Sequence, residues 1–227
     1  METKGIDFLL TGCATTLLLL LDWLLLALLL VPLTRAWFGD HHVVVDALLF
    51  LLLYGLLSGL LFRLCLRFRP LRPGDYAMDD AAFTYWKFLT MIYEFGRGAL
   101  LPFTTVVTRP LVALLFGARV GREIALGGRL ADPPLIHIGD YAVLGHNSVL
   151  TPHAITSGKC LLREIRIGNR ATVGVNVVVM PGVEIGDGAV VTAGSVVTMS
   201  TRIPPGELWG GVPARKLKDI APTDIRA

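Results

Sequence analysis

Residues 167–197 read IGNRATVGVNVVVMPGVEIGDGAVVTAGSVV. An aliphatic residue recurs at every sixth position, and the residue two positions before it is small or β-branched each time. A period of six fits neither the repeat of about 3.6 residues of an amphipathic helix nor the two-residue repeat of a strand. It is typical of a parallel β-helix, in which each hexapeptide supplies one short face and one turn. The residues expected to fill its interior are Ile167, Val173, Val179, Ile185, Val191 and Val197.

The same register continues upstream. It is held by Val120, Leu126, Ile138, Leu144 and Leu150, while Asp132 takes the one slot that does not fit. Seventeen residues separate Leu150 from Ile167, so five or eleven extra residues must leave the β-helix as a loop, and this loop contains His153. We therefore place a β-helix domain at residues 118–202, with roughly four to five coils if three hexapeptides make one coil.

The N-terminal part of the chain is unusually apolar. Hydrophobic residues make up 53% of the sequence and the mean hydropathy is +0.62. Two apolar runs, Phe8–Leu33 and Val43–Leu66, each exceed the roughly 20 residues that span a bilayer. Because the first run has no cleavage site of a secretory signal, we predict a two-span transmembrane hairpin over residues 1–72.

Charge near the second run predicts the orientation of this hairpin. Four arginines follow or end that run, at positions 63, 67, 69 and 72. By the positive-inside rule this end is cytoplasmic, as in a bacterial-type inner membrane, and the β-helix domain is expected on the cytoplasmic side.

Two aspartates lie in the apolar runs. Carboxylates are costly in hydrocarbon and usually face protein or water. We expect Asp22 to make a hydrogen bond between subunits, for example to Tyr54, with a contact to the head group of a substrate as the alternative. Asp46 is close enough to the outer interface to be solvated.

Residues 73–117 are predicted to form an interfacial helical collar. The aromatic run 83–88 is typical of an amphipathic helix at the level of the lipid head groups. Residues 99–116 are apolar but contain Pro102, Arg109 and Pro110, which favours two broken helices in the cytoplasmic leaflet. Such helices either brace the β-helix or form a slot for a lipid-borne substrate.

Charge and cysteine content exclude some classes of function. The net charge is +3, which gives no electrostatic footprint for nucleic acid. Cys13, Cys65 and Cys160 are scattered, which favours free thiols over disulfides or a metal site. After the repeat, Pro204-Pro205-Gly206 cannot join a strand ladder, so residues 203–227 are expected to leave the β-helix and fold back along its wall.

Several motifs together resemble the hexapeptide-repeat acyltransferases, a family of left-handed β-helix enzymes. The matching segments are Ile167-Gly168-Asn169, Met180–Asp187, Ala193–Thr198, Pro204-Pro205-Gly206 and Gly211–Arg215. Residues 72–153 are similar, more weakly, to a membrane-tethered subgroup that includes terminal domains of amino-acid polymer synthetases. The resemblance implies a mixed fold: transmembrane and interfacial helices followed by a left-handed parallel β-helix. It also implies a homotrimer and transfer of an acyl group from acetyl-CoA or a longer acyl-CoA to a hydroxyl or amine.

The resemblance also implies roles for individual residues. His153 matches the loop histidine that acts as general base, a task suited to an imidazole at cytoplasmic pH. Glu164 or a backbone carbonyl is a candidate for orienting it, and Glu164 is grouped with the acceptor-binding residues. The backbone N–H of Val175 matches the oxyanion donor. Asn147 matches a residue that contacts the acceptor, with a role as a corner residue as the alternative.

The positions that match the coenzyme A site lie later in the chain. Ala193 and Thr198 match residues along the pantetheine arm, and Arg215 and Lys218 match residues at the phosphates. Trp209 is expected to pack on the adenine or on the wall of the β-helix.

Two other functions compete with the enzyme prediction. Some β-helix proteins are carbonic anhydrases that hold zinc with three histidines, and His137, His146 and His153 invite that comparison. In those enzymes two of the ligands stand five residues apart, whereas His146 and His153 are seven apart. A non-catalytic β-helix scaffold is the other alternative. We predict a membrane-anchored acyltransferase that needs no metal and acts on a membrane lipid or lipid-linked glycan.

Overall fold

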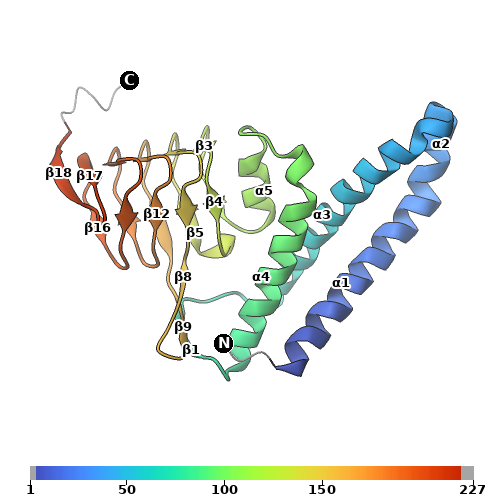
Figure 1. Cartoon of the computed structure of the whole chain (residues 1–227), viewed down its shortest axis with the longest axis horizontal. Helices are drawn as coiled ribbons and strands as arrows, with labels where there is room; N and C mark the ends of the chain where they lie inside the picture. The colour runs from blue at the N-terminus through green and yellow to red at the C-terminus, as the bar shows by residue number, and fades with distance from the viewer. Residues whose placement is uncertain (1–3, 221–227) are drawn as a thin grey trace. The chain divides into compact units, whose positions relative to one another are not determined.

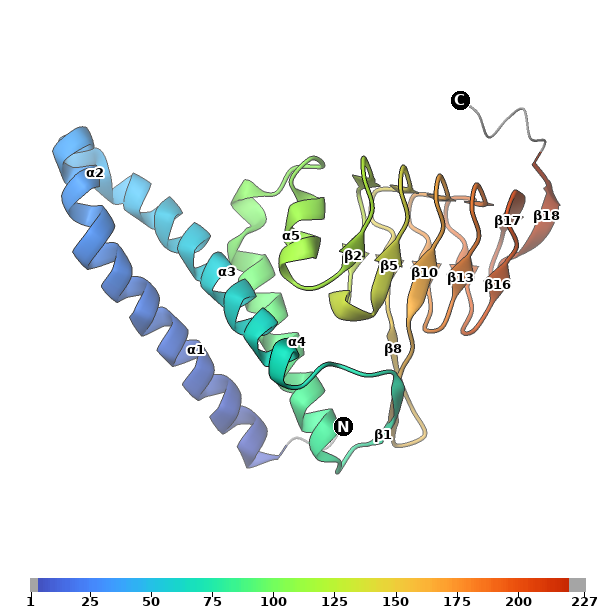
Figure 2. The ribbon, with the colours of Figure 1, turned by 180° about the vertical axis from the view of Figure 1, so that it is seen from behind.

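The computed structural model describes residues 4–220. The chain forms two compact units. The first, the helical unit, contains the residues up to Pro70 together with Ala81–Thr104. The second, the β-helix unit, contains Leu71–Asp80 and the residues from Thr105 onward. Figures 1 and 2 show the chain from two opposite sides.

The helical unit begins with a helical hairpin. Its helices follow one another from Gly5 to Phe68, and Gly39 allows the reversal by adopting a left-handed φ of 55°. In Figures 1 and 2, α1 and α3 lie side by side. The elements are α1 (Gly5–Leu25), a π-helical turn (Leu26–Leu30), α2 (Val31–Phe38), a 3-10 turn (Gly39–His41) and α3 (His42–Phe68).

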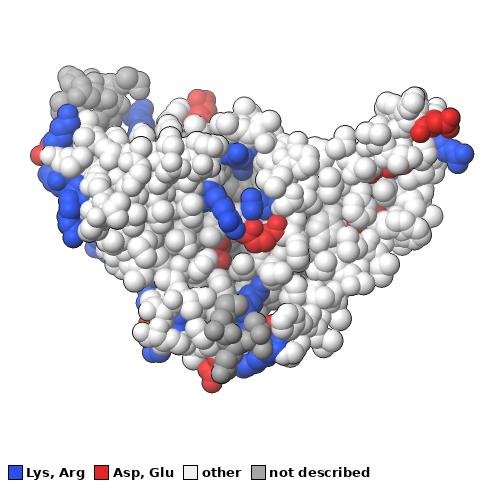
Figure 3. Space-filling model, in the orientation of Figure 1, with Lys and Arg blue, Asp and Glu red and all other residues white. Residues whose placement is uncertain are grey.

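The surface of this hairpin is apolar. By length and composition, the continuous helical segment Gly5–Phe68 is suited to crossing a membrane. Large side chains such as Leu17, Trp23 and Leu60 are more than half exposed. Figure 3 shows almost no charged side chain on the visible face of these helices, except near the turn at the end of α2. Such a surface is not covered within the helical unit.

The two aspartates of the hairpin have different surroundings. Asp22 is fully buried, and neither carboxylate oxygen has a hydrogen-bond partner among the described residues. The expected hydrogen bond from Asp22 to another subunit stays a prediction. Asp46 was expected to be solvated, but it accepts a hydrogen bond of 2.6 Å from the Thr34 hydroxyl and lies 2.6 Å from His42 Nδ1. It therefore ties the two arms of the hairpin together.

The helix α4 (Ala81–Ala99) lies where the interfacial helix was predicted, and its position at a membrane surface stays a prediction. It packs against α3, and a Cβ atom at Gly55 of α3 would lie 2.4 Å from the Leu100 side chain. Phe83 and Leu89 are at most 2% exposed. The interfacial helix was predicted from the composition of the aromatic run alone. Close approach at glycine makes α4 a third packed helix of this unit. A 3-10 turn, Leu101–Phe103, follows it.

The β-helix unit is built of short parallel strands in three sheets. Each coil adds one strand to each sheet, which confirms the expected six-residue register. The five-stranded sheet contains β2 (Arg119–Val120), β5 (Ile136–Ile138), β10 (Ile165–Ile167), β13 (Glu184–Ile185) and β16 (Arg202–Ile203). The four-stranded sheet contains β4 (Arg129–Leu130), β7 (Val149–Leu150), β12 (Val178–Val179) and β15 (Val196–Val197). The six-stranded sheet contains β3 (Ala125–Leu126), β6 (Val143–Leu144), β11 (Thr172–Val173), β14 (Val190–Val191), β17 (Glu207–Gly210) and β18 (Arg215–Asp219).

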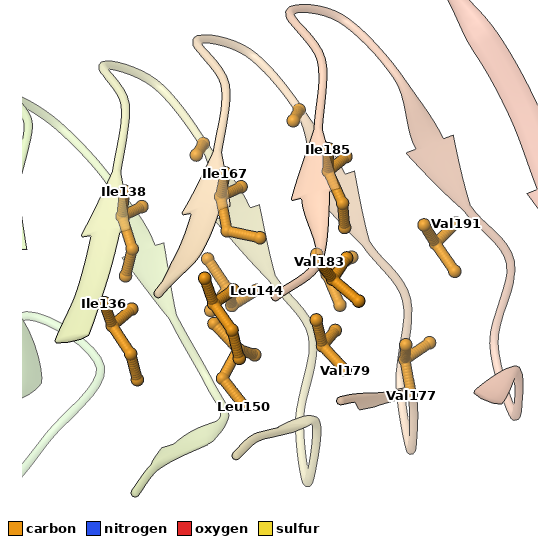
Figure 4. Close-up of a cluster of buried hydrophobic side chains, with 14 of the residues drawn as sticks. Ile136, Ile138, Leu144, Leu150, Ile167, Val177, Val179, Val183, Ile185 and Val191 are labelled. Atoms are coloured by element: carbon orange, nitrogen blue, oxygen red, sulfur yellow. The ribbon is translucent and has the colours of Figure 1, made fainter. Parts of the chain in front are cut away.

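The interior is filled as the sequence predicts. Figure 4 shows Ile138, Ile167 and Ile185 stacked in successive coils, and these residues are at most 4% exposed. Val177 and Val183, two positions before repeat residues, are fully buried. Burial of an aliphatic side chain contributes about 1.5–3 kcal/mol, so the stack is the main source of stability in this unit.

One row of corners is held by a ladder of polar side chains. Asn169 Oδ1 accepts the backbone N–H of Asp140 at 2.9 Å, and Asp187 Oδ1 accepts that of Asn169 at 2.7 Å. The preceding glycine is required for close approach: a Cβ atom at Gly168 would lie 2.6 Å from the backbone nitrogen of Asp187. This explains the repeated sequence Ile-Gly-Asp/Asn.

The β-helix has a short helix at one end and a further corner at the other. Helix α5 (Arg109–Leu115) closes the first coil through buried Ala113, and Arg109 Nη1 donates a hydrogen bond of 2.7 Å to Gly127 O. It belongs to the β-helix unit, in agreement with the bracing role given as one alternative, and its position in a membrane leaflet stays a prediction. At the other end, Pro204–Gly206 forms a further corner, since β17 still pairs in parallel with β14. Only β18 turns back, antiparallel to β17.

Candidate active site

His153 begins a hairpin that leaves the β-helix. The strands β8 (His153–Thr156) and β9 (Lys159–Leu162) pair antiparallel, and β1 (Gly74–Ala77) adds to the outer side of β9. The predicted loop is therefore a three-stranded sheet, whose third strand comes from the segment between α3 and α4. An ion pair between Arg163 and Asp75 fastens β1 to the end of β9. Sequence reasoning did not identify this brace.

A buried carboxylate orients His153. The distance from His153 Nδ1 to Asp132 Oδ2 is 2.5 Å. The Asp132 side chain is 4% exposed, while that of His153 is 29% exposed. Asp132 stands at the corner between β4 and β5, with a left-handed φ of 45°. A carboxylate on Nδ1 favours the tautomer in which Nδ1 carries the proton and Nε2 is the basic nitrogen.

Glu164, one of the candidates for this role, has other side-chain partners. Its Oε2 is 2.6 Å from Arg166 Nη2 and 3.8 Å from His137 Nε2. The structure thus places Asp132, and not Glu164, beside His153. The signal that pointed to Asp132 was its misfit: it is the one residue in the repeat register that is not aliphatic.

The hairpin also contains a buried thiol. Cys160 is fully buried, and burial together with the nearby charge of Asp132 raises its pKa to about 11. A thiol with such a pKa stays protonated at neutral pH and is a poor nucleophile. It is a free cysteine, as predicted.

The other predicted site residues lie along two edges of the four-stranded sheet. One, the histidine edge, consists of the corners after β4, β7, β12 and β15, and it holds Asp132, His153 and Thr198. The other, the asparagine edge, consists of the corners after β3, β6, β11 and β14, and it holds Asn147, Val175 and Ala193.

Residues of the asparagine edge are exposed and stacked in register. Gly194 N donates a hydrogen bond of 2.8 Å to Val175 O, and Asn176 N donates one of 3.0 Å to His146 O. Asn147 has a left-handed φ of 57°, which is the corner role given as its alternative. Within one chain, Asn147, Val175 and Ala193 are therefore on a different edge from His153.

The predicted coenzyme A residues at the C-terminal end are only partly on the surface. Trp209 packs against the interior of the β-helix, and its Nε1 donates a hydrogen bond of 2.7 Å to Glu207 Oε2. This matches the alternative in which it packs on the wall. Arg215 and Lys218 are exposed on β18. Lys216, which lies between them, bridges Glu207 and Asp219 at 2.7 Å each.

The three histidines of the zinc alternative have different environments. His137 is on the five-stranded sheet, exposed His146 is on the asparagine edge, and His153 is held by Asp132. Across residues 4–220, no group of three or more His, Cys, Asp or Glu side chains converges as metal ligands.

Comparisons with known proteins find two kinds of relative. Residues 164–199 match the sequence family described as the hexapeptide repeat of succinyl-transferase. Galactoside O-acetyltransferase of Escherichia coli is 36% identical over 102 residues, covering 42% of this chain and 49% of that protein. Mitochondrial gamma carbonic anhydrase 1 of Arabidopsis thaliana is 27% identical over 105 residues, covering 45% of this chain and 38% of that protein.

A solved structure also resembles part of the chain. A hexapeptide-repeat acetyltransferase of Vibrio cholerae, complexed with acetyl coenzyme A, is 29% identical, with a TM-score of 0.43. The alignment covers 46% of this chain and 61% of that one. The chain spans less than half the length of the curated relatives it matches. Residues 164–199 thus match a hexapeptide-repeat family, and the relatives include both acetyltransferases and gamma carbonic anhydrases.

Proposed function

We propose that this protein is a membrane-anchored acyltransferase that transfers an acetyl or longer acyl group from acyl-CoA to a membrane-associated acceptor. The observation that carries the proposal is the contact between His153 Nδ1 and the buried carboxylate of Asp132. A general base needs a fixed tautomer, and this pair provides it. A carbonic anhydrase of this fold would instead need the histidine as a zinc ligand.

The chemistry assigned to His153 is proton transfer. Its Nε2 takes the proton from the acceptor hydroxyl or amine as the acceptor oxygen or nitrogen attacks the thioester carbonyl. The backbone N–H of Val175 stabilises the oxyanion. When the tetrahedral intermediate collapses, the carbon–sulfur bond breaks and the proton passes to the sulfur of coenzyme A.

The two edges of the four-stranded sheet support a site shared between subunits. His153 and Thr198 are on the histidine edge, whereas Val175, Asn147 and Ala193 are on the asparagine edge. In a homotrimer, the histidine edge of one subunit faces the asparagine edge of the next and completes the site. Arg215 and Lys218, both exposed cations, then bind the phosphates of coenzyme A.

The helical hairpin supports a membrane anchor and a membrane-borne acceptor. At about 1.5 Å per residue, α1 and α3 are long enough to cross the roughly 30 Å of hydrocarbon. Their exposed leucines and the arginines at the end of α3 favour the inner membrane, with the β-helix on the cytoplasmic side. A small soluble acceptor would not need such an anchor, so we assign a lipid or lipid-linked glycan.

Product analysis by mass spectrometry tests the proposal. Membranes containing the wild type or His153→Ala are incubated with isotopically labelled acetyl-CoA, and extracted lipids and glycans are compared. We expect labelled acyl groups on a membrane component with the wild type only. Equal labelling in both samples would refute the role of His153.

Two further measurements separate the alternatives. A scaffold would bind no coenzyme A in calorimetry and would tolerate His153→Ala. A carbonic anhydrase would be purified with zinc and would lose it in the same variant. We expect binding of coenzyme A and no stoichiometric zinc.

A further inference from the structure

The five-stranded sheet of the β-helix presents a row of basic side chains to the outside. Arg119, His137 and Arg166 are direct partners on the neighbouring strands β2, β5 and β10. Figure 2 shows these strands side by side on the face turned to the viewer. Because neighbouring strands lie about 4.8 Å apart, the three side chains point outward within reach of one small ligand.

A hollow of about 420 Å³ lies at this row. It is lined by the three basic side chains and by the strand-end residues around Gly121, Gly139 and Gly168. One glycine follows each of these strands at the corner. Because glycine has no side chain, these positions leave the edge of the hollow open. The hollow belongs to the β-helix unit alone.

The polar groups in the hollow favour an anion. Arg119 forms no salt bridge among the described residues, while Arg166 pairs with Glu164. The Nε2 atom of His137 is buried and has no hydrogen-bond partner in the described part of the chain, its closest charged oxygen being Glu164 Oε2 at 3.8 Å. Two guanidinium groups and an imidazole thus outnumber one carboxylate, and the buried Nε2 of that imidazole lacks a hydrogen-bond partner among the described residues.

Electrostatics on His137 agree with this. Burial is the main cause that lowers its pKa, and the charges of Arg119 and Arg166 lower it further, while Glu164 raises it. The two arginines therefore create a positive potential at the imidazole. An anion bound there would reverse part of this effect and raise the pKa of His137.

The hollow is near the candidate active site. His137 is five residues from Asp132, so their Cα atoms are at most roughly 18 Å apart. Asp132 in turn contacts His153. We propose that this hollow binds a phosphate group of the acyl acceptor, carried as a lipid head group or a sugar phosphate, while its hydroxyl or amine reaches His153. The assignment to the acceptor rests on the proposed function; the phosphate site itself does not.

The test uses the full chain in detergent micelles with ¹⁵N-labelled histidine. Ring resonances are followed by NMR during titration with inorganic phosphate and with pyrophosphate, and His146 on the asparagine edge serves as the internal reference. We expect a saturable shift and a raised pKa for His137 only. Shifts of His137 no larger than those of His146 would overturn the proposal.

Matched variants locate the site. Arg119→Gln should weaken phosphate binding about tenfold, because a hydrogen-bonded charge is lost. Arg202→Gln is the control: Arg202 is on the same sheet but pairs with Glu184 at 3.4 Å and lies outside this hollow. Equal binding by wild type and Arg119→Gln, or equal weakening by the control, would contradict the proposed site.

Two further arms identify the source of the phosphate and separate the proposals. The binding of glycerol phosphate is compared with that of short-chain phosphatidylglycerol. Tighter binding of the lipid would identify a lipid head group as the source of the phosphate. Equal binding of the two would identify a sugar phosphate as the source. His153→Ala should bind phosphate like the wild type even though it transfers no acyl group. Acyl transfer by His153→Ala at the rate of the wild type would contradict the proposed function. The absence of phosphate binding would contradict only this inference.

Discussion

At the scale of single residues, the account depends on the contact between His153 Nδ1 and Asp132 Oδ2. Asp132→Asn keeps the size of the side chain but removes the charge that selects the tautomer and stabilises the imidazolium. We expect kcat to fall on the order of 10²- to 10⁴-fold with little change in the KM for acyl-CoA. Steady-state kinetics across pH 5–9 measures both.

The control for this variant is Glu164→Gln. Glu164 pairs with Arg166 and not with His153, so the kcat of Glu164→Gln should stay within about threefold of the wild type. If Glu164→Gln were the more damaging change, the carboxylate that orients the base would have been misassigned.

A second residue-level prediction concerns Cys160. Its pKa of about 11 lies above the value of 9.0 for an ordinary thiol, so the folded protein keeps a proton that the unfolded chain loses. The contribution of the protonated thiol to the free energy of unfolding is roughly 2–3 kcal/mol. It is fully present below pH 9 and is lost as the pH rises through 11. Denaturant unfolding of wild type and Cys160→Ala at pH 8 and pH 10.5 measures it.

The comparison of the two proteins isolates the thiol from other groups that titrate at high pH. The stability difference between wild type and Cys160→Ala should shrink at pH 10.5. A difference that is the same at both pH values would show that the thiol is not protected by burial.

The sequence located His153 but not its partner. The six-residue period identifies the loop in which His153 lies, because seventeen residues separate two repeat positions. Asp132 is twenty-one residues earlier, and its side chain meets His153 only because one coil stacks on the next. A contact between coils has no signature in the local sequence, apart from the misfit of Asp132 in the register.

At the scale of the elements, the corner ladder makes a prediction about glycine. A Cβ atom at Gly168 would lie 2.6 Å from Asp187 N, so Gly168→Ala must displace the next coil. We expect a loss of about 2–4 kcal/mol in the free energy of unfolding of the β-helix unit. Thermal unfolding followed by circular dichroism measures the change.

Gly98→Ala is the matched control. Gly98 is in α4, where an added Cβ atom meets nothing within 4 Å. Alanine in a helix is favoured over glycine by about 0.5–1 kcal/mol, so this variant should be unchanged or slightly more stable. Equal loss in both variants would show that the corner does not need glycine.

Elements outside the repeat were harder to predict. Pro204-Pro205-Gly206 was expected to end the β-helix, but proline is compatible with a corner, where no ladder hydrogen bond is required. The packing of α4 was not predicted: Gly55 of α3 permits a close approach, and Phe83 and Trp86 of the aromatic run are buried. Periodicity reports which residues are internal, whereas packing between distant elements depends on shapes that it does not contain.

At the scale of the whole molecule, the apolar hairpin predicts integral membrane association. Exposed side chains such as Leu17 and Leu60 would be buried in hydrocarbon. The full chain should stay in the membrane pellet after 1 M salt and alkaline carbonate, and detergent should release it as a trimer of about 74 kDa, three times 24.6 kDa. Release by salt alone would contradict the anchor, and a monomer by light scattering would contradict the shared site.

The most direct test of the central claim is the rate at which label passes from isotopically labelled acetyl-CoA to a membrane component. The account predicts that the wild type in its native membrane transfers the label. His153→Ala should transfer it at least about 10³-fold more slowly, with the binding of coenzyme A unchanged. If His153→Ala transferred the label at the rate of the wild type, the imidazole would not be the base, and the chemistry proposed for this β-helix would be wrong.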